Sequence, residues 1–457
     1  MLNKKHIKYF KKILPKDFVF SEPGDCWAYG YDNSKMHVMP ECVLFADHKS
    51  QIQNIVKYCF ENNIPITTRG RGTGNTGGSV PIENSIVLSL EKMNKIIKID
   101  ISNRLSIVEP GVINTVLQED LKKQNFFWGP DPSSQDYSTI GGNIANNSAG
   151  PRAIKYGTPR DNILGLEFIS GKGEIHKTGV KTSKGVVGLD LTRLFTGSEG
   201  VLGILTEATL KILPLNNSVK TIEITFESIE NASETIISLM TQPITPYKLE
   251  FVDNESIKLI NTIKKNHYKD NCSSAILLEI DGEEEYINIM LENIIKVIKK
   301  NKYKKITVAN CKLDIEKLWS ARKSLSPALR EIGGYKINED IAVPISNLTI
   351  LLKNLEKISE KYSIKIVNFG HAGNGNIHVN LLFKSDKEKK SNNSKKCLKE
   401  IFDLVLSLGG TLSGEHGIGI IKKEFIIKEI DKSTLSLMND IKKQFDPKNI
   451  LNPNKSI

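Results

Sequence analysis

Apolar residues in the first half of the chain follow two different spacings. Over residues 50–62 they recur at helical intervals, which places Ile52, Ile55, Val56 and Cys59 on one face. Shorter apolar runs, of strand length, stand at 86–90, 105–108 and 203–212. Glycine-rich turns separate these runs. The mixture predicts an α+β arrangement from about residue 40 to residue 214.

The second half alternates strand-like and helix-like runs. Strands are expected at 221–226 and 275–280, and a helix at 286–301. Residues 385–396 are charged and polar with no apolar partner, so they are expected to form a solvated loop before a helix at 397–408. The sequence contains no internal repeat.

The first 14 residues are basic, and Ile7, Phe10, Ile13 and Leu14 fall on one helical face. A short surface helix is expected, with a helix lying on a membrane surface as the alternative. No apolar run approaches the ~18 residues that a membrane span needs. The segment also lacks the apolar core of a signal peptide. We expect a cytoplasmic protein, with peripheral association at the inner face of the membrane as an option.

Composition narrows the classes of function. A chain of 457 residues suits two or three domains. The net charge of +11 comes with no nucleic-acid-binding motif, so an anionic cofactor and an anionic substrate are expected rather than a nucleic acid. The six cysteines form no C-x-x-C pair, which argues against a zinc ribbon or an iron–sulfur cluster held by this chain alone. Nothing indicates a secreted disulfide framework.

A glycine-rich loop, Arg-Gly-Arg-Gly-Thr-Gly-Asn-Thr-Gly-Gly-Ser at 69–79, is the strongest local signal of the first half. Its backbone N–H groups can turn toward one point and bind phosphate oxygens. It ends in no Gly-Lys-Ser/Thr, and Val80-Pro81 cannot open the helix that a dinucleotide fingerprint requires. The alternative for this loop alone is a flexible surface turn.

Two further polar, glycine-rich segments strengthen the phosphate interpretation. One spans 130–150 and contains Thr-Ile-Gly-Gly at 139–142, and the other spans 194–210 and contains Gly-Ser-Glu-Gly at 197–200. Three such loops in one domain suit a long ligand that carries a diphosphate.

In their order and spacing these three segments resemble the FAD-binding domain of the vanillyl-alcohol oxidase / p-cresol methylhydroxylase superfamily. The resemblance implies that FAD binds here. No His or Tyr in the 69–79 loop offers a covalent attachment point, so non-covalent FAD is expected. The positions implied are Arg69, Gly70, Arg71, Gly72, Thr73, Gly74, Asn75, Gly77, Gly78, Ser79, Asp131, Ser138, Thr139, Gly141, Gly142, Asn146, Glu199, Gly200, Gly203, Ile204 and Asn452.

Histidines gather in two glycine-rich turns of the second half. His371 and His378 flank a Gly-Asn-Gly turn, and Glu415-His416 lies within Gly-Glu-His-Gly. A strand is expected at 377–383, which puts His378 and Asn380 on one face. Two imidazoles and a carboxylate suit Zn²⁺, Mn²⁺ or Fe²⁺. The alternative is that flexible turns simply tolerate exposed histidines.

These turns, together with Phe445-Asp-Pro-Lys-Asn-Ile-Leu-Asn-Pro453, resemble the C-terminal domain of FAD-linked oxidases that act on 2-hydroxy acids, such as D-lactate dehydrogenase, the glycolate oxidase flavin subunit and D-2-hydroxyglutarate dehydrogenase. The resemblance implies that a divalent metal, Zn²⁺ first among the candidates, binds to His371, His378 and Glu415. It makes His416 the catalytic base and Arg322 the residue that grips the substrate carboxylate. Ser326, Lys336, Asn380 and His416 are implied as further substrate-binding residues.

The predicted architecture is α+β. An N-terminal helical segment (1–39) precedes a two-subdomain FAD-binding domain of the p-cresol methylhydroxylase type (40–216). An α+β substrate and metal domain (217–457) follows, with a C-terminal segment that returns to the flavin.

The predicted activity is oxidation of a small D-2-hydroxy acid to the 2-oxo acid by hydride transfer to FAD. Two alternatives are the flavin subunit of a multi-subunit glycolate oxidase complex, against which the metal-type motifs argue, and a non-redox flavin transferase. Metal-assisted hydrolysis was a third, and the three flavin-type loops argue against it. The electron acceptor stays open among a quinone, a cytochrome, an electron-transfer flavoprotein and an iron–sulfur subunit.

Overall fold

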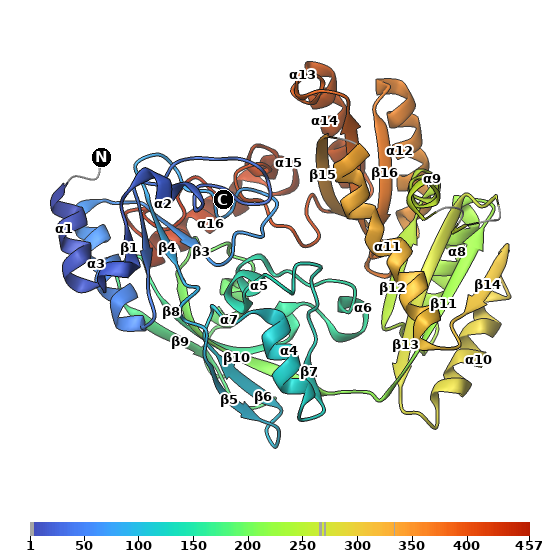
Figure 1. Cartoon of the computed structure of the whole chain (residues 1–457), viewed down its shortest axis with the longest axis horizontal. Helices are drawn as coiled ribbons and strands as arrows, with labels where there is room; N and C mark the ends of the chain where they lie inside the picture. The colour runs from blue at the N-terminus through green and yellow to red at the C-terminus, as the bar shows by residue number, and fades with distance from the viewer. Residues whose placement is uncertain (1–3, 265–266, 269–270, 333) are drawn as a thin grey trace. The chain divides into compact units, whose positions relative to one another are not determined.

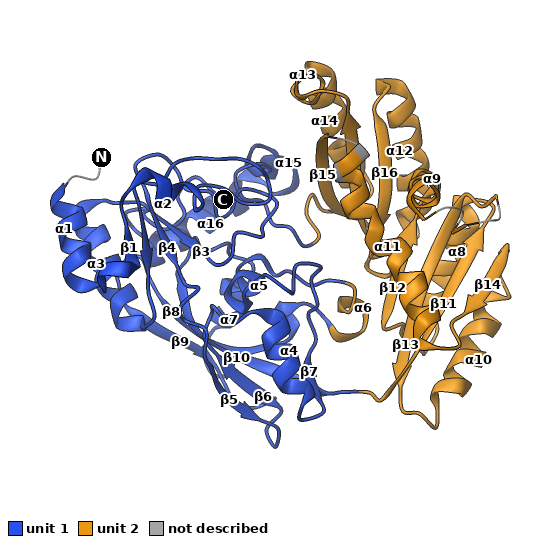
Figure 2. Cartoon of the chain, viewed as in Figure 1, with its two compact units in different colours: residues 1–150, 157–215, 415–457 blue, residues 151–156, 216–414 orange. Residues whose placement is uncertain are grey.

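The computed structural model describes residues 4–264, 267–268, 271–332 and 334–457. The chain forms two compact units, shown in two colours in Figure 2. Unit 1 contains residues 1–150, 157–215 and 415–457, and unit 2 contains residues 151–156 and 216–414. Within the described residues, no helix is long and apolar enough to cross a membrane.

Unit 1 begins with a small sheet in the order β1 (Val19–Phe20), β2 (Cys42–Phe45), β4 (Ile86–Ser89) and β3 (Ile66–Arg69). Strands β2, β4 and β3 are parallel. Helix α3 (Lys49–Asn62) packs with them through Ile52, Ile55, Val56 and Cys59, the face that its periodicity predicted. Helix α1 (Lys4–Ile13) buries Phe10, and Tyr9 stacks on Tyr58 of α3, which confirms the expected N-terminal helix.

The second sheet of unit 1 is antiparallel. Its order is β5 (Ile96–Asp100), β6 (Leu105–Val108), β10 (Ile204–Pro214), β8 (Ile163–Ile169) and β9 (Ile175–Gly179), and β7 (Phe126–Trp128) also pairs with β10. Helices α4 (Asn114–Lys122), α5 (Ile140–Asn146), α7 (Leu191–Phe195) and α16 (Lys432–Phe445) contribute to its core. Short helices α2 (Pro23–Trp27) and α15 (Ile426–Glu429) also belong to this unit. The expected strands at 86–90, 105–108 and 203–212 are confirmed as β4, β6 and β10.

The C-terminal segment of the chain belongs to unit 1. Lys442 of α16 is buried, and its Nζ donates to the Val201 and Leu451 carbonyls and to Asp446 Oδ2 at 3.0 Å. The Asp446 carboxylate in turn accepts the N–H groups of Ile450 and Leu451. This network holds the Phe445–Pro453 signature against the FAD-type half of the chain.

Unit 2 is built on one seven-stranded sheet, whose strands run from yellow-green to orange in Figure 1. All of its pairings are antiparallel. Strands β11 and β13 confirm the expected runs at 221–226 and 275–280, and β17 confirms the one at 377–383. The strand order is β14 (Lys305–Val308), β11 (Ser218–Phe226), β13 (Ser274–Gly282), β12 (Lys248–Val252), β16 (Lys365–Gly370), β17 (Asn376–Phe383) and β15 (Tyr335–Ala342).

Eight α-helices belong to this unit among the described residues. The expected helix at 286–301 is confirmed as α10, four residues shorter. The set is α6 (Ala153–Tyr156), α8 (Ile229–Met240), α9 (Asn254–Ile263), α10 (Ile287–Ile298), α11 (Lys312–Ile332), α12 (Leu348–Tyr362), α13 (Asp386–Lys389) and α14 (Asn392–Ser407).

The prediction of a solvated loop over 385–396 is wrong. Ser385 caps α13 by accepting the Glu388 N–H, and Ser391 caps α14 by accepting the Ser394 N–H. Serine hydroxyls at these positions satisfy backbone donors that a helix start leaves open. Helix α14 therefore begins five residues before its first predicted residue.

The compact units do not follow chain order as the predicted domains do. The break between Leu215 and Asn216 lies next to the expected boundary at 216/217. Residues 415–457, however, cluster with unit 1, as expected of a segment that returns to the flavin, and residues 151–156 cluster with unit 2. The proposed domain limits stay a prediction.

The Lys442–Asp446 pair generates a stability prediction. Asp446→Asn leaves a buried ammonium without its counter-charge, so we expect a loss of about 3 kcal/mol in unfolding free energy. The control is Asp440→Asn on the same helix, because the Lys443–Asp440 pair is exposed and is expected to contribute less than about 1 kcal/mol. Urea unfolding of both variants checks this, and equal midpoints would contradict it.

Candidate active site

The glycine-rich loop follows directly on β3 in unit 1. At Gly72, φ is +64°, and a Cβ there would lie 2.1 Å from Arg69 Nη2. At Gly70 a Cβ would lie 2.4 Å from Thr139 Oγ1. The positive φ at Gly72 strains any residue with a side chain, and a Cβ at Gly70 would force the Thr139 hydroxyl to move, so this path of the loop favours glycine at both positions.

Buried polar atoms without hydrogen bonds surround this loop. They are Thr68 Oγ1, Ser79 Oγ and Asp32 Oδ2. A buried polar atom that is left unsatisfied costs free energy, so such a cluster in a native fold calls for a ligand that supplies the missing partners. The loop therefore fits a polar cofactor such as FAD.

The Thr-Ile-Gly-Gly segment, expected to be a loop, begins a helix instead. Thr139 Oγ1 accepts the Gly142 N–H at 3.2 Å and thereby caps α5. A Cβ at Gly141 would lie 2.6 Å from Pro110, so this glycine permits a close approach of two backbones. The helix escaped sequence analysis because glycine disfavours helices.

Glu199 joins the third loop to the C-terminal segment within unit 1. It has a φ of 51°, and its buried carboxylate accepts the N–H groups of Ile418 and Gly419 at 2.8 and 2.7 Å. Burial raises the pKa of the Glu199 carboxyl, and these two amides lower it by less. The Thr76 carbonyl accepts the Ile420 N–H, so the glycine-rich loop contacts the same segment.

Glu415 and His416 lie at the start of this segment. Glu415 Oε2 accepts the Gly150 N–H at 2.9 Å, and the His416 carbonyl accepts the Thr76 hydroxyl at 3.3 Å. The predicted metal ligand and the predicted base are therefore held by the second and first cofactor loops.

Several other predicted cofactor residues have structural contacts. Arg71 forms an exposed ion pair with Glu91, and Arg69 donates to the Tyr31 carbonyl. Asn452 accepts the Thr68 N–H and donates to the Glu199 carbonyl.

The remaining predicted cofactor residues lie in the same three segments. Gly203 packs beside Phe168 in the core, and Ile204 is the first residue of β10. Thr73, Gly74, Asn75, Gly77 and Gly78 continue the first loop, Asp131 and Ser138 are buried before α5, Asn146 ends α5, and Gly200 follows Glu199.

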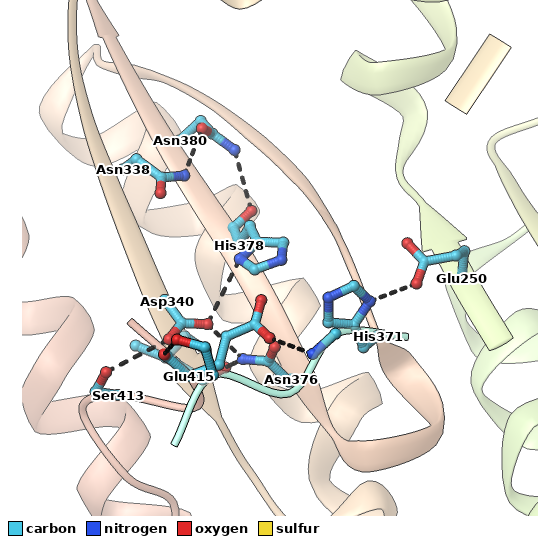
Figure 3. Close-up of polar contacts among 12 residues, drawn as sticks. Glu250, Asn338, Asp340, His371, Asn376, His378, Asn380, Ser413 and Glu415 are labelled. Carbon is cyan, nitrogen blue, oxygen red and sulfur yellow. Dashed lines mark hydrogen bonds and ion pairs between the residues drawn. The ribbon is translucent and has the colours of Figure 1, made fainter. Parts of the chain in front are cut away.

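The second group of predicted residues lies on the sheet of unit 2. His371 follows β16, and its Nδ1 hydrogen-bonds the carboxylate of Glu250, a buried residue of β12. Figure 3 shows this contact. A partner on Nδ1 fixes the ring and leaves Nε2 as the atom that can bind a metal.

His378 has a matching neighbour. Its Nδ1 lies 3.5 Å from Oδ1 of Asp340, its cross-strand partner on β15 (Figure 3). Asp340 is fully buried and also accepts hydrogen bonds from Asn376 and Ser413. The rings of His371 and His378 lie 5.2 Å apart, nearly perpendicular. Two imidazoles are thus positioned together, each beside a buried carboxylate.

Arg322 lies on α11. Its Nε donates to Glu250 Oε2 at 2.8 Å, and its guanidinium lies over the Phe369 ring at 4.4 Å. Burial raises the pKa of Glu250, but the charges of His371 and Arg322 lower it by more, to well below its usual range. Glu250 is therefore an ionised anchor for both residues.

The other predicted substrate residues differ in their surroundings. Ser326, one helical turn beyond Arg322, is exposed. Lys336 is half-buried at the start of β15. The Asn380 side chain is fully buried, accepts from Asn338, and donates to the Val367 and His378 carbonyls (Figure 3). Their roles in substrate binding stay predictions.

Sequence analysis missed Glu250, Asp340 and Asp32. Glu250 carries a detectable signal, because it is a carboxylate among the apolar residues of β12, and such residues are rarely buried without a partner. Asp340 lies in a polar stretch of β15 and carries no such signal. No local pattern marks Asp32.

Comparison with known proteins assigns the two halves. Residues 40–179 match the family model described as FAD binding domain, and residues 215–456 match FAD linked oxidases, C-terminal domain. A glycolate oxidase subunit GlcD of Bacillus subtilis is 37% identical over 96% of this chain and 94% of its own length. A D-lactate dehydrogenase of Anaerostipes hadrus is 32% identical over 98% of this chain and 96% of its own length.

Solved structures support the fold. p-Cresol methylhydroxylase with substrate bound matches with a TM-score of 0.80 at 19% identity, over 99% of this chain and 96% of that one. An alkyldihydroxyacetonephosphate synthase matches with a TM-score of 0.78 at 18% identity, over 100% of this chain and 85% of that one. The predicted two-domain FAD-binding fold is thus confirmed, and the chain belongs to the family of FAD-linked oxidases, as an FAD-dependent oxidoreductase.

Proposed function

We propose that this flavoprotein oxidises a small D-2-hydroxy acid to the 2-oxo acid in a metal-assisted reaction. The observation that carries the proposal is the pairing of two neighbouring imidazoles with two buried carboxylates, Glu250 beside His371 and Asp340 beside His378. Outer carboxylates of this kind orient metal-binding histidines and raise their basicity. Relatives named D-lactate dehydrogenase and glycolate oxidase subunit support the substrate class.

His371, His378 and Glu415 would hold the ion. Glu415 follows directly on Gly414, whose N–H donates to the Asp340 carbonyl, so chain continuity favours its membership. The donor set suits Zn²⁺, with Mn²⁺ and Fe²⁺ as alternatives. A divalent cation supplies Lewis acidity that lowers the pKa of an alcohol bound to it.

The protein's own residues bind the substrate and move one proton. Arg322 offers a planar fork for the substrate carboxylate, and Glu250 and Phe369 fix its orientation. His416 accepts the hydroxyl proton, and its backbone is tied to the cofactor loop through Thr76. The hydride leaves the substrate Cα, for which FAD supplies the acceptor when bound.

The second candidate is the flavin subunit of a multi-subunit oxidase. Sequence motifs argued against it, but relatives named GlcD are themselves called glycolate oxidase subunits, and this chain covers 94% of the Bacillus subtilis protein. An iron–sulfur or cytochrome partner would then take the electrons.

The six cysteines form no disulfide in the structure, which favours a cytoplasmic location.

A dye-reduction screen tests the activity. The purified protein is expected to reduce an artificial acceptor with at least one of D-lactate, glycolate, D-malate and D-2-hydroxyglutarate, and to turn over L-lactate more slowly. A protein that carries FAD but reduces no dye with any of these acids would instead indicate a non-redox flavin transferase.

Glu250 tests the metal. Glu250→Gln weakens the orientation of His371, so we expect metal affinity to fall about 10–100-fold, measured as bound metal after dialysis. Glu255→Gln, on neighbouring α9 in exposed ion pairs, is the control and should keep its metal. If a chelator leaves turnover of the unaltered protein unchanged, the reaction does not need the metal and the proposal is wrong.

Arg322→Lys tests carboxylate binding. Lysine keeps the positive charge but loses the planar fork, so we expect KM to rise about 30-fold, equivalent to about 2 kcal/mol. The neighbouring exposed Lys323→Met is the control. An unchanged KM in Arg322→Lys would show that another cation binds the carboxylate.

A further inference from the structure

Lys455 is a buried lysine beside the glycine-rich loop, and it takes no part in the proposed oxidation. Only 1% of it is exposed. Its Nζ donates to the Gly78 carbonyl at 3.0 Å and to Thr67 Oγ1 at 3.2 Å. These contacts place it between β3 and the loop, and both acceptors are neutral. Lysine is almost never buried to this degree without a charged partner.

Three other charged groups act on Lys455 within unit 1: Asp32, Glu199 and Arg69. Asp32 and Glu199 both face the loop, since a Cβ at Gly74 would lie 3.7 Å from Asp32 Oδ2 and a Cβ at Gly78 would lie 3.6 Å from Glu199 Oε2. With Lys455 protonated and both carboxylates ionised, the formal charges of the four groups sum to zero.

We propose that Lys455 is the cation that balances the FAD diphosphate beneath this loop, and that it takes up a proton when FAD binds. The diphosphate brings further negative charge to a cluster that has no positive excess even when Lys455 is protonated, and a net charge of −1 when it is neutral. A buried site cannot hold that excess without compensation. Of the four groups, only the amine of Lys455 can change from neutral to positive, because Arg69 is charged already.

The electrostatics of Lys455 support this assignment. Burial, with a smaller contribution from the charge of Arg69, lowers its pKa to about 7, although the charges of Asp32 and Glu199 act to raise it. About half of the amine is therefore neutral near pH 7 when the site holds no FAD. An anionic ligand raises this pKa, so FAD binds most tightly below about pH 7. Its affinity then falls by up to about tenfold per pH unit as the pH rises through that value.

The inference rests on FAD binding and not on the proposed substrate, so its failure would leave the hydroxy-acid activity untouched. The test uses the full-length protein after removal of FAD. The dissociation constant of added FAD is measured by flavin fluorescence from about pH 6 to about pH 9. We expect it to rise about 10–100-fold between about pH 7 and about pH 9.

Two variants and a control test whether Lys455 causes the pH dependence of the FAD dissociation constant. Lys455→Arg keeps a permanent positive charge and is expected to bind FAD with little pH dependence over this range. Lys455→Met should bind more weakly at neutral pH and also lose the slope. Lys123→Met, an exposed lysine of unit 1, should behave as the unaltered protein. A slope that persists in Lys455→Arg would assign the proton to Asp32 or Glu199 and overturn the proposal.

Calorimetry counts the proton directly. Binding enthalpies of FAD in two buffers of different ionisation enthalpy, at about pH 8, give the number of protons exchanged. We expect uptake of about one proton by the unaltered protein and none by Lys455→Arg. FAD binding without proton uptake in the unaltered protein would contradict the inference even if neither variant folds.

Discussion

The arrangement on the sheet of unit 2 depends on the carboxylate of Glu250. It is buried on β12, yet it hydrogen-bonds both His371 and Arg322, and these two partners keep it ionised. An isolated carboxylate at this depth would be strongly destabilised. One buried anion thus orients both an imidazole and a guanidinium, the two groups that are proposed to bind the metal and the substrate carboxylate.

A second constraint operates within unit 1. The segment that starts at Glu415 runs along Thr76 and Glu199, so residues from three parts of the chain share one framework of backbone hydrogen bonds. Lys442 and Asp446 hold the end of this segment in place. The proposed base, His416, is therefore attached to the loops that are predicted to bind FAD. This explains why the last 43 residues cluster with a half of the chain far away in sequence.

The sequence predicted what local patterns encode. The apolar face of α3 and the strands β4, β6, β10 and β17 follow from periodicity, and the glycine loops from their composition. Helix α5 and the start of α14 were missed because glycine and polar residues at these positions disfavour a helix. In each case one hydroxyl cap, from Thr139 or from Ser391, stabilises the helix start. The role of Glu250 could not be assigned from the sequence, because it depends on a contact with His371, which lies 121 residues away. Family resemblance supplied the residue roles that no local pattern contains.

Removal of hydride from the substrate is proposed to require a metal ion bound by His371 and His378. An anaerobic titration of the flavoprotein with its best D-2-hydroxy acid tests this most directly, with absorbance reporting flavin reduction in metal-loaded and metal-free protein. We expect bleaching within the turnover time only in the metal-loaded protein, and recovery when Zn²⁺ or Mn²⁺ is added back. Equally fast bleaching of metal-free protein, with FAD still bound, would contradict the account.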